Sequence, residues 1–493
     1  MSAFRILGHG RVDHARPIRF TFDGRSIEGR AGDTVASALL ANGMHLVGRS
    51  FKYHRPRGIV TAGSEEPNAL IDTSRGAGRR EPNTRATVQE IYEGLATESQ
   101  NRWPSLKFDI GAINDRLAMF LAAGFYYKTF MWPRSFWDRV YEPFIRAAAG
   151  LGKSPSEPDP DHYASRYLHC DVLVVGAGPA GLAAALSAAR SGASVVVADE
   201  QAELGGSLLS ERGATIEGKS AWEWLSSVLS ELHDLPNVQL LIRTTAIGYY
   251  HQNMIGLCQR VTDHLQSPPE NAPRERLWRI RAAQVVLAQG AIEKPLVFDG
   301  NDRPGIMLAG AARTYLNRYG VKVGNRAAIV TSHDSAWTTA FELAEAGITV
   351  SAIVDLRPDV DPAIRTRALS LGIEVLAGHT VTGTSGRLRV SSVRVNAIEN
   401  GHAGSGRNID CDALLMCGGW TPSLHLFSHT QGKLDWHAET ATFLPGRKTE
   451  ECHIAGAGRG LWGIAAALED GAAAGNAVAS ATGYRASSAR YRV

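Results

Sequence analysis

Six consecutive residues, Gly176-Ala177-Gly178-Pro179-Ala180-Gly181, have the types and the spacing to hold the pyrophosphate of a dinucleotide. The first glycine permits a tight turn, the second lets a phosphate approach the backbone, and the third lets the following helix pack on the preceding strand. The N–H groups that begin this helix would point at the pyrophosphate. Asp199, followed by Glu200 and Gln201, stands where a carboxylate can accept hydrogen bonds from the adenosine ribose. An acid there favours NAD over NADP, because it would repel a 2′-phosphate.

The segments around this motif supply the elements that such a site requires. The apolar run Asp171–Val175 precedes the glycines, and the Ala-rich segment Leu182–Arg190 follows them. A second apolar run, Ser194–Ala198, ends directly before Asp199. Strand, glycine turn, helix, strand and acid are the order of a dinucleotide-binding βαβ unit.

From Cys170 onward the chain resembles the α/β fold with two dinucleotide-binding domains that glutathione-reductase-like and thioredoxin-reductase-like enzymes share. Val285–Ala291 is similar to the strand at which that fold crosses between its domains. A second βαβ unit is expected over residues 327–355, after which Asp412–Pro422 returns the chain to the first domain and His453–Gly460 leads into the last helix. The resemblance implies further cofactor-binding residues, with Thr245-Ala246 near the adenine: Gly205, Gly206, Ser207, Thr245, Ala246, Ala288, Gln289, Gly290, Gly456, Ala457 and Gly458.

Three features usual for this fold are missing from the sequence. The second βαβ turn, Thr331–Ala336, contains no glycine, so its side chains would keep a pyrophosphate away and the second nucleotide site is predicted to be closed. The five cysteines are scattered and form no CxxC or CxxxxC pair, which excludes disulfide-reductase chemistry. Ala457 stands where flavin enzymes of this fold usually carry Asp. We therefore expect NAD in the first site, with FAD as the alternative.

The N-terminal residues form a separate pattern. Residues 17–29 alternate apolar and polar side chains around Asp23-Gly24, which predicts a β-hairpin, and Gly32–Thr34 is predicted to cap a helix. Together with Arg55–Leu70, this pattern resembles a plant-type [2Fe–2S] ferredoxin domain. Such a cluster needs about four thiolates, whereas residues 1–169 contain no cysteine. A ferredoxin-like docking module without a cluster is expected, and no metal site.

Long strings at separated places resemble one family, the α subunit of heterotetrameric sarcosine oxidase and related multi-subunit flavin amine oxidases. The strings are Ser50–Gly58, Glu81–Thr87, Asn101–Leu106, Gly124–Pro133, Cys170–Leu182, Asn301–Met307 and Arg313–Gly320. The resemblance implies a β subunit that carries FAD, binds most of the substrate and oxidises a small secondary amine. It also implies an FMN between α and β, an NAD on the α chain, and small γ and δ subunits. Arg313-Thr314-Tyr315 is expected to open a helix and hold the FMN phosphate. No catalytic residue is assigned to this chain.

The α chain of sarcosine oxidase continues into a folate-binding domain, whereas this chain ends at Val493. Folate-dependent capture of formaldehyde is therefore not expected here. Either a separate chain performs it, or the substrate is an amine that releases no formaldehyde, as in opine oxidases and proline or hydroxyproline dehydrogenases, so sarcosine is not assumed. Two alternatives stay open: a self-sufficient FAD/NAD(P)H oxidoreductase, and a scaffold that a nucleotide merely stabilises.

Composition excludes other classes of function. A net charge of +3 without a dense basic block argues against nucleic-acid binding. No apolar run reaches about 18 residues, and the first residues lack the core of a signal peptide, so no membrane contact and a cytoplasmic location are expected. The expected divisions are residues 1–98 (docking module), 99–169 (aromatic-rich helical bridge), 170–300 (first nucleotide domain), 301–410 (degenerate second domain) and 411–493 (return to the first domain).

Overall fold

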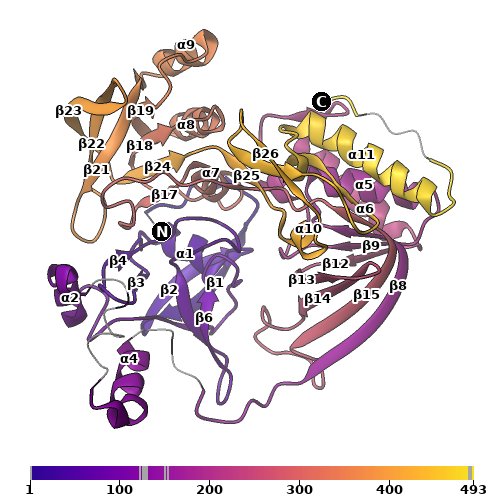
Figure 1. Ribbon diagram of the computed structural model, residues 1–493, viewed down its shortest axis with the longest axis horizontal. Helices are drawn as coiled ribbons and strands as arrows, with labels where there is room; N and C mark the ends of the chain where they lie inside the picture. Colours follow the sequence, from indigo (N-terminus) through magenta and orange to yellow (C-terminus); the bar gives the residue numbers. More distant parts are fainter. Residues whose placement is uncertain (1–2, 122–123, 125–131, 149–151, 153–154, 487–490) are drawn as a thin grey trace. The chain divides into compact units, whose positions relative to one another are not determined.

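The computed structural model describes residues 3–121, 124, 132–148, 152, 155–486 and 491–493 (Figure 1). The chain divides into two compact units, each built from two separate stretches. Unit 1 comprises residues 1–160 and 294–419, and unit 2 comprises residues 161–293 and 420–493. The structure thus groups the ferredoxin-like residues with the predicted second nucleotide domain, which the sequence had suggested as separate divisions.

The first half of unit 1 is a five-stranded sheet with one short helix. Asp23 and Gly24 have φ angles of 50° and 74°, and they connect two antiparallel strands, which confirms the predicted hairpin. Thr34 caps helix α1 through a capping box with Ser37, and every residue of this helix is buried. The sheet order is β2-β1-β7-β5-β6, with a separate β3–β4 pair. The elements are β1 (Asp13–Phe22), β2 (Arg25–Ala31), α1 (Val35–Ala41), β3 (Gly48–Arg49), β4 (Pro56–Arg57), β5 (Leu70–Ser74), β6 (Arg80–Arg85) and β7 (Ala96–Ser99).

Short helices follow this sheet, in the segment where a helical bridge was expected. Its described residues expose many large apolar side chains, among them Met119, Phe120 and Trp132. Most of the aromatic string Gly124–Pro133 lies outside the described residues. The helices are the 3₁₀ turns Ile110–Ala112, Ala118–Phe120 and Arg134–Phe136, the π-helical turn Trp137–Tyr141, α2 (Ile113–Arg116) and α4 (Glu142–Ala148).

The second half of unit 1 contains the predicted second βαβ unit, formed by β18, α8 and β19. These strands belong to a five-stranded parallel sheet of order β17-β24-β18-β19-β20, and an antiparallel β21-β22-β23 sheet accompanies it. The elements are β17 (Ile306–Leu308), α7 (Ala309–Asn317), β18 (Arg326–Thr331), α8 (Ser335–Glu345), β19 (Thr349–Asp355), α9 (Pro362–Ser370), β20 (Glu374–Ala377), β21 (His379–Ser385), β22 (Ser392–Glu399), β23 (His402–Asp410) and β24 (Ala413–Cys417).

Strand β24 corrects one expectation. The sequence placed residues 412–422 on the way back to the first domain, but β24 pairs with β17 and β18 inside the second sheet. All five residues of β24 are buried. A short, wholly apolar run fits the centre of any parallel sheet, so its pattern could not show which sheet it joins. The chain enters unit 2 again at Trp420.

Unit 2 is built on a seven-stranded sheet of order β12-β9-β8-β15-β14-β13, in which β28 also pairs with β15. Helices α5 and α11 pack together so closely that an added Cβ on Gly471 would lie 2.1 Å from the Ala180 carbonyl oxygen. Among the described residues, no helix combines the length and the apolar character needed to cross a membrane. The main elements are β8 (Tyr163–Val175), α5 (Pro179–Arg190), β9 (Val195–Ala198), α6 (Ala221–Asp234), β12 (Val238–Leu241), β13 (Thr244–Tyr250), β14 (Met254–Arg260), β15 (Glu275–Leu287), β28 (Cys452–Ile454) and α11 (Ile464–Ala481).

Smaller elements complete unit 2 around this sheet. The short strand β16 follows β15 and pairs with β25, close to the two points at which the chain changes units. The smaller elements are β10 (Thr215–Ile216), β11 (Lys219–Ser220), β16 (Ala291–Glu293), β25 (Trp420–Pro422), α10 (His425–His429), β26 (Leu434–His437), β27 (Thr442–Pro445) and the 3₁₀ turns Gly206–Ser210 and Gly456–Arg459.

Candidate dinucleotide site

Two glycines of the predicted turn are required by the packing of the protein itself. Gly176 follows strand β8 with a φ of 94°, and an added Cβ would lie 2.4 Å from the carbonyl oxygen of Ala288. An added Cβ on Gly181 would lie 1.8 Å from the carbonyl oxygen of Gly176. Both distances are far below van der Waals contact, so any side chain at either position would displace backbone.

Gly178 is different, because the protein leaves space beside it. It is the N-cap of helix α5, its φ of −74° is open to any residue, and Pro179 occupies the first turn. The nearest atom to an added Cβ is the Cα of Gly206, 4.0 Å away. A glycine that packing does not demand, at the N-terminus of a twelve-residue helix, fits a phosphate that approaches the backbone.

Asp199 lies against the glycine turn, as the sequence suggested. Its Oδ2 accepts a hydrogen bond from the Ala177 N–H at 2.7 Å, and its Oδ1 accepts one from the Gln201 N–H at 2.8 Å. Each carboxylate oxygen has a second lone pair, so these bonds orient the group and still allow it to accept from a ribose. The carbonyl of the neighbouring Glu200 accepts from Arg260 Nη2 at 3.1 Å.

The loop at Gly205, Gly206 and Ser207 meets the same turn. The Gly205 N–H donates to the Ala177 carbonyl at 2.9 Å, and an added Cβ on Gly206 would lie 2.8 Å from the Cα of Gly178. Residues Thr245 and Ala246 belong to strand β13, whose first residue, Thr244, donates its N–H to the carbonyl of Asp199 at 2.7 Å. The structure therefore brings these predicted residues to one place.

The crossover residues Ala288-Gln289-Gly290 border the turn from the other side. The Ala288 N–H donates to the Val175 carbonyl at 2.8 Å, and Gly290 has a φ of 71°. Gln289 Oε1 is buried and has no hydrogen-bond partner within the described part of the chain. A buried acceptor without a partner costs about 1–3 kcal/mol. A polar ligand group that donates to it would remove this cost, so the residues fit a bound dinucleotide.

The final glycine motif contributes a carboxylate that sequence reasoning missed. Gly456, Ala457 and Gly458 lie in a 3₁₀ turn, and Gly456 abuts Ala180 in the first turn of α5. Asp470 of helix α11 accepts from the Gly456 N–H through Oδ2 at 2.8 Å and from Arg459 Nη1 through Oδ1 at 2.9 Å. An acid thus stands beside the motif, although position 457 is Ala. Its only signal in the sequence is the acidic pair Glu469-Asp470 within an otherwise Ala/Gly-rich helix.

Side chains fill the corresponding turn of the second βαβ unit. His333 is half-buried, which lowers the pKa of its imidazole, and its Nδ1 lies 3.0 Å from Ser335 Oγ. The buried acid that ends β19, Asp355, accepts from Trp337 Nε1 at 3.0 Å and from Arg357 Nη2 at 2.8 Å. The acid at the ribose position is thus already bound by the protein's own donors, consistent with a closed second site.

Arg313-Thr314-Tyr315 does not open a helix, and this expectation is wrong. Helix α7 begins at Ala309, so the three residues lie in its middle. Arg313 forms a bidentate ion pair with Glu342, with both N–O distances at 2.8 Å, and Thr314 Oγ1 donates to the Gly310 carbonyl. Tyr315 is fully buried and presents nothing to a ligand. The helix start was placed too late because Ala309-Gly310-Ala311-Ala312 carries no capping residue.

Two family models match the chain. Residues 15–102 match the 2Fe-2S iron-sulfur cluster binding domain, and residues 170–442 match the pyridine nucleotide-disulphide oxidoreductase domain. Among solved structures, L-proline dehydrogenase from P. horikoshii has a TM-score of 0.64 at 18% identity, covering 99% of this chain and 77% of that one. T. acidophilum thioredoxin reductase has a TM-score of 0.50 at 20% identity, covering 64% of this chain and 99% of that one. These structural likenesses show the fold.

Sequence relatives extend the similarity along the whole chain. The alpha subunit of sarcosine oxidase from Rhizobium meliloti (strain 1021) is 53% identical over 478 residues, 97% of this chain and 47% of that relative. An opine oxidase subunit of Agrobacterium tumefaciens (strain Ach5) is 27% identical over 333 residues, 61% of this chain and 63% of that relative. This chain spans about half the length of the sarcosine oxidase subunits that it matches. Since the oxidoreductase match covers residues 170–442, more than half of the chain, the chain belongs to the pyridine nucleotide-disulphide oxidoreductase family.

Proposed function

We propose that this chain is the α-type subunit of a multi-subunit, flavin-dependent oxidase or dehydrogenase that acts on a small secondary amine. The observation that carries the proposal is 53% identity, over 97% of the chain, to the alpha subunit of a sarcosine oxidase. The likeness to opine oxidase subunits supports the same reaction class and leaves the amine open to sarcosine-, opine- or proline-like substrates.

In this proposal the first nucleotide site holds NAD. The space beside Gly178, the Asp199 carboxylate against the glycine turn, and Ala457, which offers no side-chain hydrogen bond to the ribityl chain of an FAD, support this assignment. FAD is the alternative, and the Asp470 carboxylate beside the last motif is the feature that keeps it open.

The amine chemistry is assigned to a partner. An FAD-containing β subunit would bind and oxidise the amine, an FMN would lie between the two subunits, and small γ- and δ-type chains would complete the assembly. Arg313 is a candidate for the FMN phosphate only if Glu342 releases it, because the carboxylate holds the guanidinium with two hydrogen bonds. The N-terminal module would dock without a cluster, since residues 15–102 contain no cysteine.

The chain's own residues would bind and orient rather than react. When bound, a nicotinamide dinucleotide supplies hydride chemistry. The N-terminus of α5 would hold the pyrophosphate, Asp199 the ribose, and Gln289 Oε1 would accept a hydrogen bond from the ligand. His333 occupies the turn of the second βαβ unit, and Asp355 at the end of β19 is bonded to Trp337 and Arg357, which weighs against a self-sufficient NAD(P)H oxidoreductase.

Two measurements test this proposal. The purified native chain is denatured, and the supernatant is chromatographed against NAD, NADP, FAD and FMN standards. About one NAD per chain supports the assignment, whereas equimolar FAD or NADP overturns it. In parallel, tagged chain is purified from its native host, and the partners are identified by mass spectrometry. Recovery without any flavoprotein partner would contradict the proposed place in a multi-chain enzyme.

A further inference from the structure

The loop over residues 60–69 is wrapped around one buried carboxylate, that of Glu66, which is only 1% exposed. Glu66 Oε2 accepts from the Val60 N–H at 2.9 Å, the Thr61 N–H at 2.7 Å and the Thr61 hydroxyl at 3.2 Å. Glu66 Oε1 accepts from the Asn68 N–H at 2.8 Å and the Ala69 N–H at 3.0 Å. Five donors from one loop thus converge on a single anionic group.

The spacing of this loop is that of an iron–sulfur ligand set. Four residues separate Thr61 from Glu66, and two separate Glu66 from Ala69. Plant-type [2Fe–2S] domains carry three of their cysteines with the same C-x₄-C-x₂-C spacing. The three positions also lie inside the stretch that matches the 2Fe-2S binding domain. In this chain they are occupied by a hydroxyl, a carboxylate and a methyl group.

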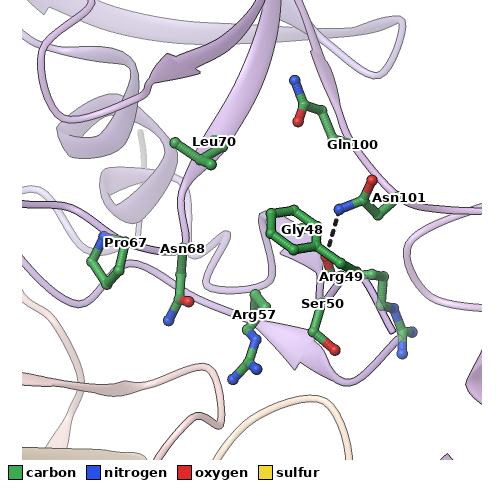
Figure 2. A pocket seen from close by; sticks show the side chains of 10 residues that line it. Gly48, Arg49, Ser50, Arg57, Pro67, Asn68, Leu70, Gln100 and Asn101 are labelled. Carbon is green, nitrogen blue, oxygen red and sulfur yellow. Dashed lines mark hydrogen bonds between the residues drawn. The ribbon is translucent and has the colours of Figure 1, made fainter. Parts of the chain in front are cut away.

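A fourth position of the same kind meets the loop directly at Thr87, which is 4% exposed and donates its Oγ1 hydroxyl to the Gly63 carbonyl at 2.6 Å. The neighbouring Ala86 N–H donates to the Ala69 carbonyl at 2.9 Å. Gln100 is 6% exposed, and its Oε1 is buried without a hydrogen-bond partner in the described residues, while its Nε2 donates to Asp72. Gln100, Pro67 and Asn68 line one cavity of about 110 Å³ (Figure 2). Plant-type domains take their last cysteine from a distant part of the sequence. Thr87, which contacts the loop between Thr61 and Glu66, fits that place, whereas Gln100 lines this cavity and donates to Asp72.

We propose that the Glu66 carboxylate replaces an iron–sulfur cluster as the group that organises this loop, and that Thr61, Glu66, Ala69 and Thr87 occupy the four former ligand positions. In cluster-bearing domains, thiolates hold the cluster and hydrogen-bond donors point at its sulfurs. Here the same kind of donors bond to a side chain that the loop itself supplies. The module keeps the loop's ordered conformation and loses the capacity to carry electrons.

The ordered loop connects the ferredoxin-like half of unit 1 to helix α7. The Val60 carbonyl accepts from the Leu308 N–H at 2.9 Å, at the start of α7. The Thr61 carbonyl accepts from the hydroxyl of the fully buried Tyr315 at 2.8 Å. Because Glu66 holds the N–H groups of the same two residues, it positions the carbonyls that tie the ferredoxin-like half to helix α7. This inference does not depend on the proposed amine oxidation.

Amide hydrogen exchange on the full chain tests the organising role. The variants are Glu66→Gln, which keeps shape and removes charge, and Glu66→Ala, with Glu65→Gln as a control at the exposed neighbouring acid. Both Glu66 variants are expected to lower protection of the Val60, Thr61, Asn68 and Ala69 amides by about tenfold or more. The control is expected to leave them unchanged. Wild-type protection in both Glu66 variants would overturn the proposal, and Glu66→Gln keeps the test decisive if Glu66→Ala does not fold.

Iron reconstitution tests the ligand positions. The full chain carrying Thr61→Cys, Glu66→Cys, Ala69→Cys and Thr87→Cys is incubated anaerobically with iron and sulfide, beside a variant in which Thr87 is retained. The fourfold variant is expected to take up about two irons per chain with the absorbance of a [2Fe–2S] cluster. The variant that keeps Thr87 should take up clearly less. Equal uptake in the two variants would remove Thr87 from the set, and a folded fourfold variant without iron would overturn the assignment of all four positions.

Discussion

Alanine at Gly178 and alanine at Gly181 should have opposite consequences, although the two glycines belong to one motif. At Gly178 the φ of −74° suits alanine, and the nearest atom to the added Cβ is 4.0 Å away. Alanine is a poorer N-cap than glycine by up to about 1 kcal/mol. A compatible Gly→Ala change restores about 0.4–1 kcal/mol through the unfolded chain. The two terms nearly cancel, so the ligand-free Gly178→Ala protein should unfold at the wild-type temperature.

The affinity of the Gly178→Ala protein for the dinucleotide should fall instead. The added methyl group would occupy the space through which a pyrophosphate meets the start of α5. Loss of hydrogen bonds to a charged group costs about 1.5–3 kcal/mol. That corresponds to roughly ten- to a hundredfold in Kd. Calorimetric titration of ligand-stripped chain with NAD measures the change directly.

Gly181→Ala is the matched contrast. Its Cβ would lie 1.8 Å from the Gly176 carbonyl oxygen, so backbone must move before the ligand is even considered. Overpacking of this kind costs about 1–3 kcal/mol. For a unit of this size that lowers Tm by roughly 2–4 °C per kcal/mol. The reasoning is refuted if Gly178→Ala binds NAD with wild-type affinity, or if Gly181→Ala melts at the wild-type temperature.

Three further predictions concern an ion pair, the cysteines and the activity. Arg313→Ala should destabilise the chain by about 1–3 kcal/mol, because the Glu342 carboxylate loses two hydrogen bonds, and a thermal melt measures this. FMN retention that falls in Arg313→Ala but not in Glu342→Gln would assign Arg313 to the phosphate. Burial raises the pKa of the Cys411 thiol, which is 3% exposed, to about 12, so at pH 8 almost none of it is thiolate. Ellman's reagent should therefore label it slowly in the native chain and fully after unfolding, and stoichiometric labelling within minutes would contradict the burial. The isolated chain should neither oxidise sarcosine, proline or opines nor consume NAD(P)H at an enzymatic rate, and turnover comparable to a flavoenzyme would show that the chemistry does not need a partner.

Local features of the chain could be predicted from the sequence because nearest neighbours decide them. The hairpin at Asp23-Gly24, the cap at Thr34 and the two βαβ units depend on φ preferences, short side chains and hydrophobic period, all of which are written in contiguous residues. The glycine motif with Asp199 likewise follows from spacing alone. The spacing predicts that Gly178, Gly206 and Asp199 line one pocket. In the structure Gly206 lies against Gly178 and the Asp199 carboxylate accepts from the Ala177 N–H, while their role in binding a ligand stays a prediction.

Tertiary structure decided the features that depend on partners far away in the chain. Strand β24 could have joined either sheet, because a wholly buried apolar run satisfies both. Asp470 of helix α11 accepts a hydrogen bond from the Gly456 N–H, and Glu342 of helix α8 forms an ion pair with Arg313 of helix α7. Neither pairing has a signature in the local sequence. Glu66 looks like one more surface acid in a loop until its five donors are seen together. The physical reason is common to all of them. A buried charge needs hydrogen-bond donors or acceptors and an apolar run needs apolar neighbours, but only the folded chain determines which residues provide them.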